Sequence, residues 1–304
     1  MTGAFPVLAV LLATSGDVSP GPPTFSAAVE VVRLDVSVTR DGLPVKNLQA
    51  SDFEVFDEGV PQTVQLVAQD ETAVHAVLAL DVSSSVAGEK LSELKAAAHR
   101  FVDALRPDDT LSLLTFSECI DLVALQSRSR EEAHASVARA QARNTTSLRD
   151  TALAALTLAD PSSGRPLVLV FSDGEDVGSF VSPESVVELA RESEVIVHAV
   201  VPSGPEGPGF LPDLTAETGG RTWLVGEGDR LGDIFVRALE EFRSRYRLQF
   251  EPQGVKAGGW HRLRVRLKSA PGKVYARRGY VHRGGASERP GPPGRGWSTT
   301  ARGQ

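Results

Sequence analysis

The middle of this 304-residue sequence alternates between short apolar runs and amphipathic segments, and this alternation constrains the fold more than any other feature. The run VHAVLALD at 74–81 is almost continuously apolar up to its final aspartate, as in a strand buried on both faces. The segment 89–105 then carries apolar residues at helical spacing. Strands that alternate with helices form a mostly parallel sheet that helices cover on both faces. We therefore predict an α/β fold with a doubly wound, mostly parallel sheet.

The same alternation continues as far as residue 246. Right-handed crossovers place the loops that follow the strands at one edge of such a sheet, where ligands bind. Further strands are predicted at 110–116, 166–173, 194–201 and 221–225, and further helices at 130–143, 148–158, 182–192, 211–218 and 231–246.

Segments with a period of two flank this region on both sides. Apolar and polar residues alternate at 29–67 and again after residue 246, which is typical of half-buried antiparallel strands. We expect these N- and C-terminal segments to form one small antiparallel β unit. The predicted organisation is a signal peptide at 1–25, an N-terminal β segment at 28–70, the α/β domain at 73–245, a C-terminal β segment at 246–283 and a disordered tail at 284–304.

The N-terminal apolar stretch at 4–13 has about the length of the central region of a signal peptide and is too short to span a bilayer. The small residues at its end, Ala13-Thr14-Ser15, form the expected cleavage site. We therefore expect a secreted or periplasmic protein without a transmembrane segment. The single cysteine, Cys119, excludes an internal disulfide, and its place after an apolar run predicts a buried thiol.

Polar oxygens follow two of the predicted buried strands at the point where each strand ends. Asp81 ends the first and is followed by Ser83 and Ser85, and Asp173 ends the second. The loop before the helix at 148–158 adds Thr146. Carboxylates and hydroxyls without cysteine or clustered histidine suit Mg²⁺, Mn²⁺ or Ca²⁺ rather than zinc. The alternative is a simple turn, because Asp and Ser side chains also bond to nearby backbone N–H groups.

The stretch DVSSS at 81–85 resembles the Asp-x-Ser-x-Ser signature of von Willebrand factor type A (vWA) domains, and the order of strands and helices matches over about 73–245. With its flanking β segments, the chain resembles bacterial secreted vWA-related proteins over about 28–283. The resemblance implies a metal-ion-dependent adhesion site. Its ligands would be Asp81, Ser83, Ser85, Thr146 and Asp173, although Arg143 and Asn144 stand where the family usually has small glycines.

The function expected from this site is binding without catalysis: a protein partner would offer an acidic side chain to the bound cation. A metal-dependent hydrolase that uses Asp81 as nucleophile is the second hypothesis, but Ser83 stands where a haloacid-dehalogenase-type enzyme has its second aspartate. A purely structural scaffold is the third. The basic residues that alternate along 262–268 predict a solvated strand face, and without a groove or aromatic platform they do not predict nucleic-acid binding.

Overall fold

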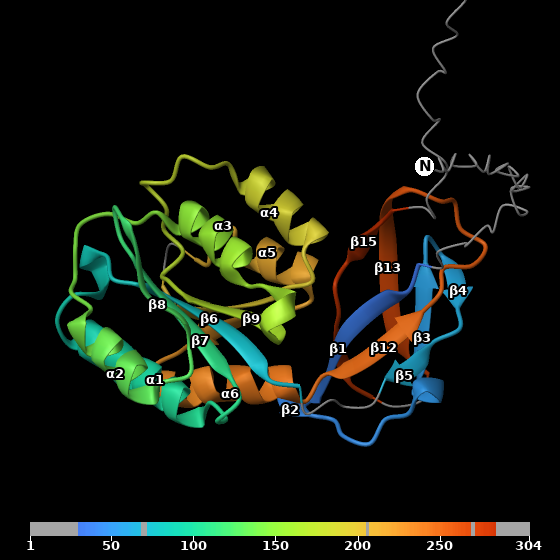
Figure 1. Cartoon of the computed structure of the whole chain (residues 1–304), viewed down its shortest axis with the longest axis horizontal. Helices are drawn as coiled ribbons and strands as arrows, with labels where there is room; N and C mark the ends of the chain where they lie inside the picture. The colour runs from blue at the N-terminus through green and yellow to red at the C-terminus, as the bar shows by residue number, and fades with distance from the viewer. Residues whose placement is uncertain (1–29, 68–71, 205–206, 269–270, 284–304) are drawn as a thin grey trace, which may run out of the picture.

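A computed structural model describes residues 30–67, 72–204, 207–268 and 271–283. The predicted signal peptide at 1–25 and the predicted tail at 284–304 lie outside these residues. The described chain forms an α/β unit and a β unit that lie side by side (Figure 1).

Within the described residues, the α/β unit is built on a six-stranded mixed sheet with the order β11-β10-β9-β6-β7-β8. Every neighbouring pair of strands is parallel except β7 and β8. All of β6 is buried, because it has a strand on each side and a core on each face. The strands are β6 (Val74–Asp81), β7 (Thr110–Phe116), β8 (Ile120–Ser127), β9 (Arg165–Phe171), β10 (Ile196–Pro202) and β11 (Thr222–Val225).

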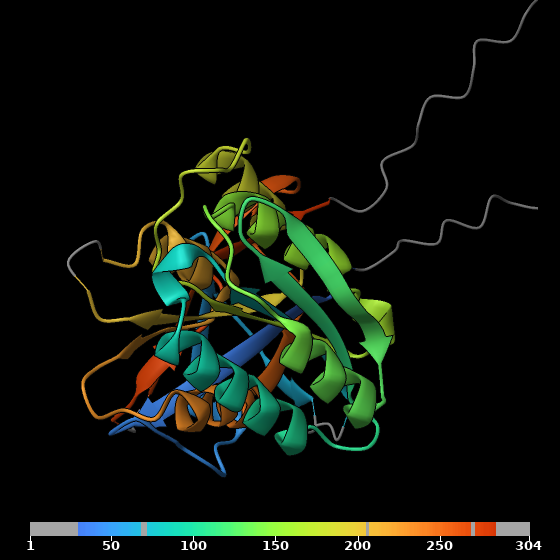
Figure 2. The ribbon, with the colours of Figure 1, turned by 90° about the vertical axis from the view of Figure 1, so that its left-hand side faces the viewer.

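Helices cover both faces of this sheet (Figures 1 and 2). On one face, α1, α2 and α6 share a core in which Phe101 packs edge-on against Phe235. On the other face, α3, α4 and α5 bury Leu148, Val186 and Leu214. The helices are α1 (Glu89–Ala104), α2 (Arg130–Arg139), α3 (Leu148–Leu158), α4 (Pro183–Glu192), α5 (Leu211–Thr218) and α6 (Leu231–Arg243), with single 3₁₀ turns η1 (Ala50–Asp52), η2 (Ser84–Val86) and η3 (Pro161–Ser163).

The β unit combines strands from both ends of the described chain. Its two sheets have the orders β14-β1-β12-β5, with β2 paired to β1, and β15-β13-β3-β4. Leu34, Val55, Leu248 and Tyr280 belong to the core of this unit, so neither end could bury its apolar face alone. The strands are β1 (Val32–Arg40), β2 (Leu43–Pro44), β3 (Phe53–Asp57), β4 (Val60–Gln62), β5 (Gln65–Val67), β12 (Tyr246–Phe250), β13 (Gly259–Leu267), β14 (Lys273–Tyr275) and β15 (Gly279–His282).

Three local expectations are corrected by the structure. The helix predicted to reach residue 143 ends at Arg139, because the following loop bonds to the loop after β6: the Arg143 N–H donates to the Val82 carbonyl at 2.8 Å. The edge strand β8 was not predicted, since it is only partly buried and its alternation is irregular. Cys119 is exposed because it lies in the turn between β7 and β8 rather than within β7.

Candidate metal site at the sheet edge

Two adjacent parallel strands bring the predicted aspartates to the same edge of the sheet. The register between β6 and β9 pairs Leu80 with Phe171, so that the next residues, Asp81 and Ser172, are neighbours across the strands. Asp173 follows at once, in the loop just beyond the end of β9 at Phe171 and not within the strand as predicted. The two strand-end carboxylates therefore meet for the reason anticipated from the sequence, that the carboxyl ends of parallel strands share an edge.

The Asp81 carboxylate is completely buried and both of its oxygens are engaged. Oδ1 accepts the Ser83 backbone N–H at 2.9 Å, and Oδ2 accepts the Ser172 hydroxyl at 2.7 Å. Burial raises the pKa of Asp81 above its usual value, the hydrogen bonds from Ser83 and Ser172 oppose this, and the nearby Asp173 charge adds to the rise. The negative charge of Asp173 is therefore close enough to Asp81 to disfavour the ionised form of its buried carboxyl group.

A chain of hydroxyls connects the two loops. The Ser83 Oγ lies 3.0 Å from the Ser85 Oγ, and the Ser85 hydroxyl donates to Asp173 Oδ2 at 2.6 Å. Ser83 is buried, Asp173 is half-buried and Ser85 is exposed. The cluster therefore runs from the interior at Asp81 to the surface at Ser85, and it is accessible from outside.

Thr146 lies on a third loop that is fastened to the other two through the backbone. Its carbonyl accepts the Gly178 N–H at 2.8 Å, from the loop that begins at Asp173. The carbonyl of Asn144 accepts both the backbone N–H and the hydroxyl of Ser84. Among the described residues, however, the Thr146 hydroxyl forms no hydrogen bond with the other four predicted ligands. The structure thus places Thr146 beside the cluster without joining it to the hydrogen-bonded chain.

Ser172 was missed by the sequence analysis, although it holds the buried oxygen of Asp81. The only sequence signal for it was its position directly before Asp173, and its role depends on the strand register. The loop that continues from Asp173 exposes two apolar side chains that were also missed: Phe180 is 98% and Val177 is 64% exposed. Their loop is anchored to α3, since Asp176 pairs with Arg149 at 2.8 Å.

The chemistry of the donor set fits a hard divalent cation. Within the described part of the chain, no group of three or more His, Cys, Asp or Glu side chains is arranged to hold a metal ion. This cluster instead offers two carboxylates and several hydroxyls, all of them oxygen donors. Within the described part of the chain, neither Asp81 nor Asp173 forms an ion pair with a Lys, Arg or His side chain; the Lys90 ammonium donates instead to the Ser85 carbonyl at 3.1 Å.

Residues 76–235, more than half of the chain, match the family model of the von Willebrand factor type A domain. The chain belongs to the vWA family. Among curated proteins, none matches this sequence significantly.

Several solved structures are similar to parts of this chain. A von Willebrand factor type A protein from Catenulispora acidiphila is 12% identical, with a TM-score of 0.51 over 86% of this chain and 74% of that one. The protein BatB from Bacteroides thetaiotaomicron is 14% identical, with a TM-score of 0.48 over 56% and 98%. The vWF domain of the type V pili tip protein Mfa5 from Porphyromonas gingivalis is 9% identical, with a TM-score of 0.46 over 57% and 95%.

The described residues contain no helix that is both long and apolar enough to cross a membrane.

Proposed function

We propose that this vWA protein binds a protein partner through a divalent cation held at the sheet edge by Asp81, Ser83, Ser85, Thr146 and Asp173. The observation that supports this most directly is a pair of carboxylates that sense each other's charge, are joined through Ser83 and Ser85, and have no ion-pair partner among the described residues. Such a cluster costs free energy unless a cation or protons neutralise it. Mg²⁺ is the proposed ion, with Mn²⁺ or Ca²⁺ as substitutes.

When bound, the ion would supply an open coordination position that an acidic side chain of the partner completes. The protein's own residues do the rest. Asp81, whose carboxylate is held by Ser172, would bind the ion from the interior side. The exposed Ser85 and the half-buried Asp173 would bind it from the side that faces solvent. Phe180 and Val177 would add apolar contact area beside it, since aromatic residues are enriched at protein interfaces.

The proposed role is binding without catalysis, in a secreted or periplasmic protein. Asp81 is the residue that a hydrolase on this edge would use as nucleophile. Its side chain is fully buried and is held by hydrogen bonds from Ser83 and Ser172, so a substrate could not contact it directly, whereas a cation at Ser83, Ser85 and Asp173 could still be held by it through water. This arrangement favours a binding site over a hydrolytic one.

Isothermal titration of the full chain with MgCl₂ and MnCl₂ tests the metal site. We expect saturable binding that Asp81→Asn abolishes and Asp108→Asn preserves, because Asp108 is exposed at the opposite end of the sheet. At an ion concentration about a hundredfold above Kd, the free energy of unfolding should rise by about 2.7 kcal/mol. Absence of binding to the wild type, or equal binding by Asp81→Asn, would refute the site.

The adhesive role is tested separately by partner capture from an extract of the source organism, with and without EDTA. We expect a captured protein that is lost with EDTA and in Ser85→Ala. Ser84→Ala is the matched control, since Ser84 points its hydroxyl to Asn144 instead of the cluster. A partner retained equally in EDTA would contradict metal-dependent recognition.

A further inference from the structure

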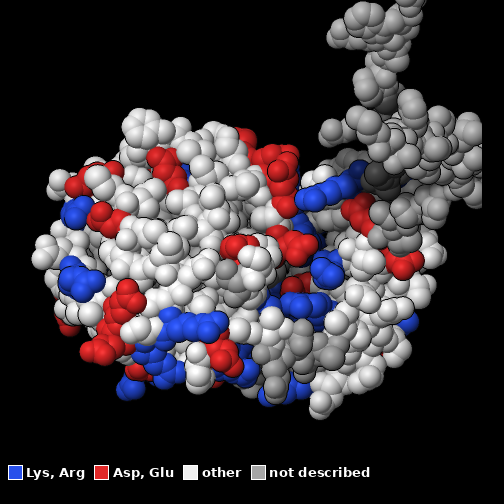
Figure 3. All heavy atoms as spheres, in the orientation of Figure 1, with Lys and Arg blue, Asp and Glu red and all other residues white. Residues whose placement is uncertain are grey.

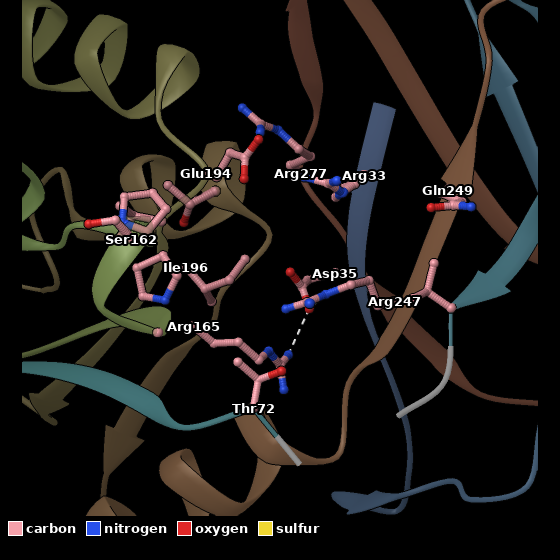
Figure 4. A pocket seen from close by; sticks show the side chains of 16 residues that line it. Arg33, Asp35, Thr72, Ser162, Arg165, Glu194, Ile196, Arg247, Gln249 and Arg277 are labelled. Carbon is pink, nitrogen blue, oxygen red and sulfur yellow. Dashed lines mark hydrogen bonds and ion pairs between the residues drawn. The ribbon is translucent and has the colours of Figure 1, made fainter. Parts of the chain in front are cut away.

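A cavity of about 540 Å³ lies between the α/β unit and the β unit (Figure 4). It is at the edge where β9 and β10 begin, opposite the edge that holds Asp81, and it is lined by residues of both units. Arg33 and Asp35 come from β1, Arg165 begins β9, and Arg277 follows β14. Its size falls within the range of small-molecule sites in proteins.

Positive charge exceeds negative charge in this lining. Arg33, Arg165, Arg247 and Arg277 face the cavity together with Asp35 and Glu194. The single Asp35 carboxylate serves two of the cations, with Arg165 at 2.7 Å and Arg247 at 4.0 Å. Arg33 forms no ion pair with any described residue. Basic side chains, interleaved with acidic ones, are also visible along the junction of the units in the space-filling view (Figure 3).

Arg165 is the most informative of these cations because it is only 6% exposed and still incompletely paired. One terminal nitrogen donates to Asp35 and to the Phe242 carbonyl, and the guanidinium lies 4.6 Å above the Phe242 ring. Its Nε–H has no hydrogen-bond partner among the described residues. Burial lowers the pKa of Arg165, Asp35 opposes this, and the neighbouring Arg247 and Arg245 lower it further.

Arg277 is held in place before any ligand arrives. Its Nε donates to the Gly279 carbonyl and a terminal nitrogen donates to the Arg191 carbonyl, both at 2.6 Å. A guanidinium that is already positioned loses less conformational entropy when it binds an anion. Two of the lining arginines, Arg165 and Arg277, are therefore preorganised on opposite sides of the cavity (Figure 4).

We propose that this cavity binds a small anion with two or more anionic groups, whose oxygens accept hydrogen bonds from Arg33, Arg165 and Arg277. Phosphate and carboxylate groups share this chemistry, since guanidinium binds both through paired N–H donors. Because the lining belongs to both units, the bound anion would also fix the vWA domain against the β unit. The site is independent of the metal-dependent binding proposed for the opposite edge.

Titration calorimetry of the full chain with pyrophosphate and with citrate, at constant ionic strength, tests the proposal and distinguishes phosphate from carboxylate ligands. We expect saturable binding of at least one anion, with a rise in Tm. Arg33→Gln should weaken this binding about tenfold, in keeping with the loss of one charge-assisted hydrogen bond. Arg33 is exposed, so the variant should fold normally.

Arg266→Gln is the matched control, because Arg266 is also an exposed strand arginine of the β unit but lies outside the cavity. It should bind the anion like the wild type, as should Asp81→Asn, which tests independence from the metal site. Binding of neither anion, or equal weakening in Arg33→Gln and Arg266→Gln, would overturn the proposal.

Discussion

The buried charges at the end of α6 allow a quantitative prediction. Glu241 lies 2.8 Å from the Nε2 of His198 and 3.1 Å from Arg245, and all three side chains are almost fully buried. Although burial opposes it, the Arg245 charge holds the pKa of Glu241 well below its usual value. Glu241→Gln keeps the size of the side chain but leaves the Arg245 guanidinium as an uncompensated buried charge.

Removing one partner of a buried ion pair costs about 3–5 kcal/mol. The glutamine oxygen can still accept a hydrogen bond, so we expect a loss near the lower end, about 3 kcal/mol. For a domain of this size, this corresponds to a fall in Tm of about 6–12 °C. Urea denaturation followed by circular dichroism measures the loss directly.

Glu240→Gln is the control, because Glu240 is the exposed neighbour on the same helix and should change stability by less than about 0.5 kcal/mol. Adding Arg245→Met to Glu241→Gln should restore stability, since it removes the uncompensated charge. If Glu241→Gln costs less than about 1 kcal/mol, or if Arg245→Met destabilises that variant further, the assigned cause is wrong.

Three further predictions concern packing, pH and binding. Gly220→Ala should destabilise by about 3 kcal/mol in urea denaturation, because its Cβ would lie 1.7 Å from the Val197 carbonyl oxygen. Burial lowers the pKa of His198 below 6.5, so its contribution to stability is complete above that value and is lost progressively as the pH falls below it. Unfolding measured at about pH 8 and about pH 5 should show this loss, and His198→Gln should reduce it. Phe180→Ser should leave Tm and Mg²⁺ binding unchanged but weaken partner capture; unchanged capture would exclude Phe180 from the interface.

Much of the α/β unit could be predicted because its strands are buried on both faces and therefore consist almost entirely of apolar residues. The apolar runs of β6, β9 and β10 indicated strands inside a mostly parallel sheet, and the family match confirms the vWA resemblance drawn from DVSSS and the strand-end Asp173. β8 was not predicted because an edge strand is only partly buried, so its sequence shows no continuous apolar run and no regular alternation. The end of α2 was predicted wrongly because the loop after it forms hydrogen bonds with a segment distant in the sequence, which the local pattern does not indicate.

The candidate site divides in the same way. That Asp81 and Asp173 meet follows from the polarity of parallel strands, which the sequence alone predicts. That Ser172 fixes Asp81, and that Ser83, Ser85 and Asp173 form one hydrogen-bonded chain, depends on strand register and loop conformation. Their role as metal ligands, with Thr146, stays a prediction.

The sequence by itself determined the class of the fold and the edge at which its polar loops gather, because both follow from local periodicity and strand direction. Only the tertiary structure decided what lies between the two units. Arg33, Arg165 and Arg277 share no motif or spacing, and they face one cavity because β1 pairs with β12 and the β unit packs against the start of β9. Contacts between residues so distant along the chain produce no periodic pattern in the sequence. The periodicity of a strand indicates which of its own residues are buried, and it does not indicate which distant segment covers them.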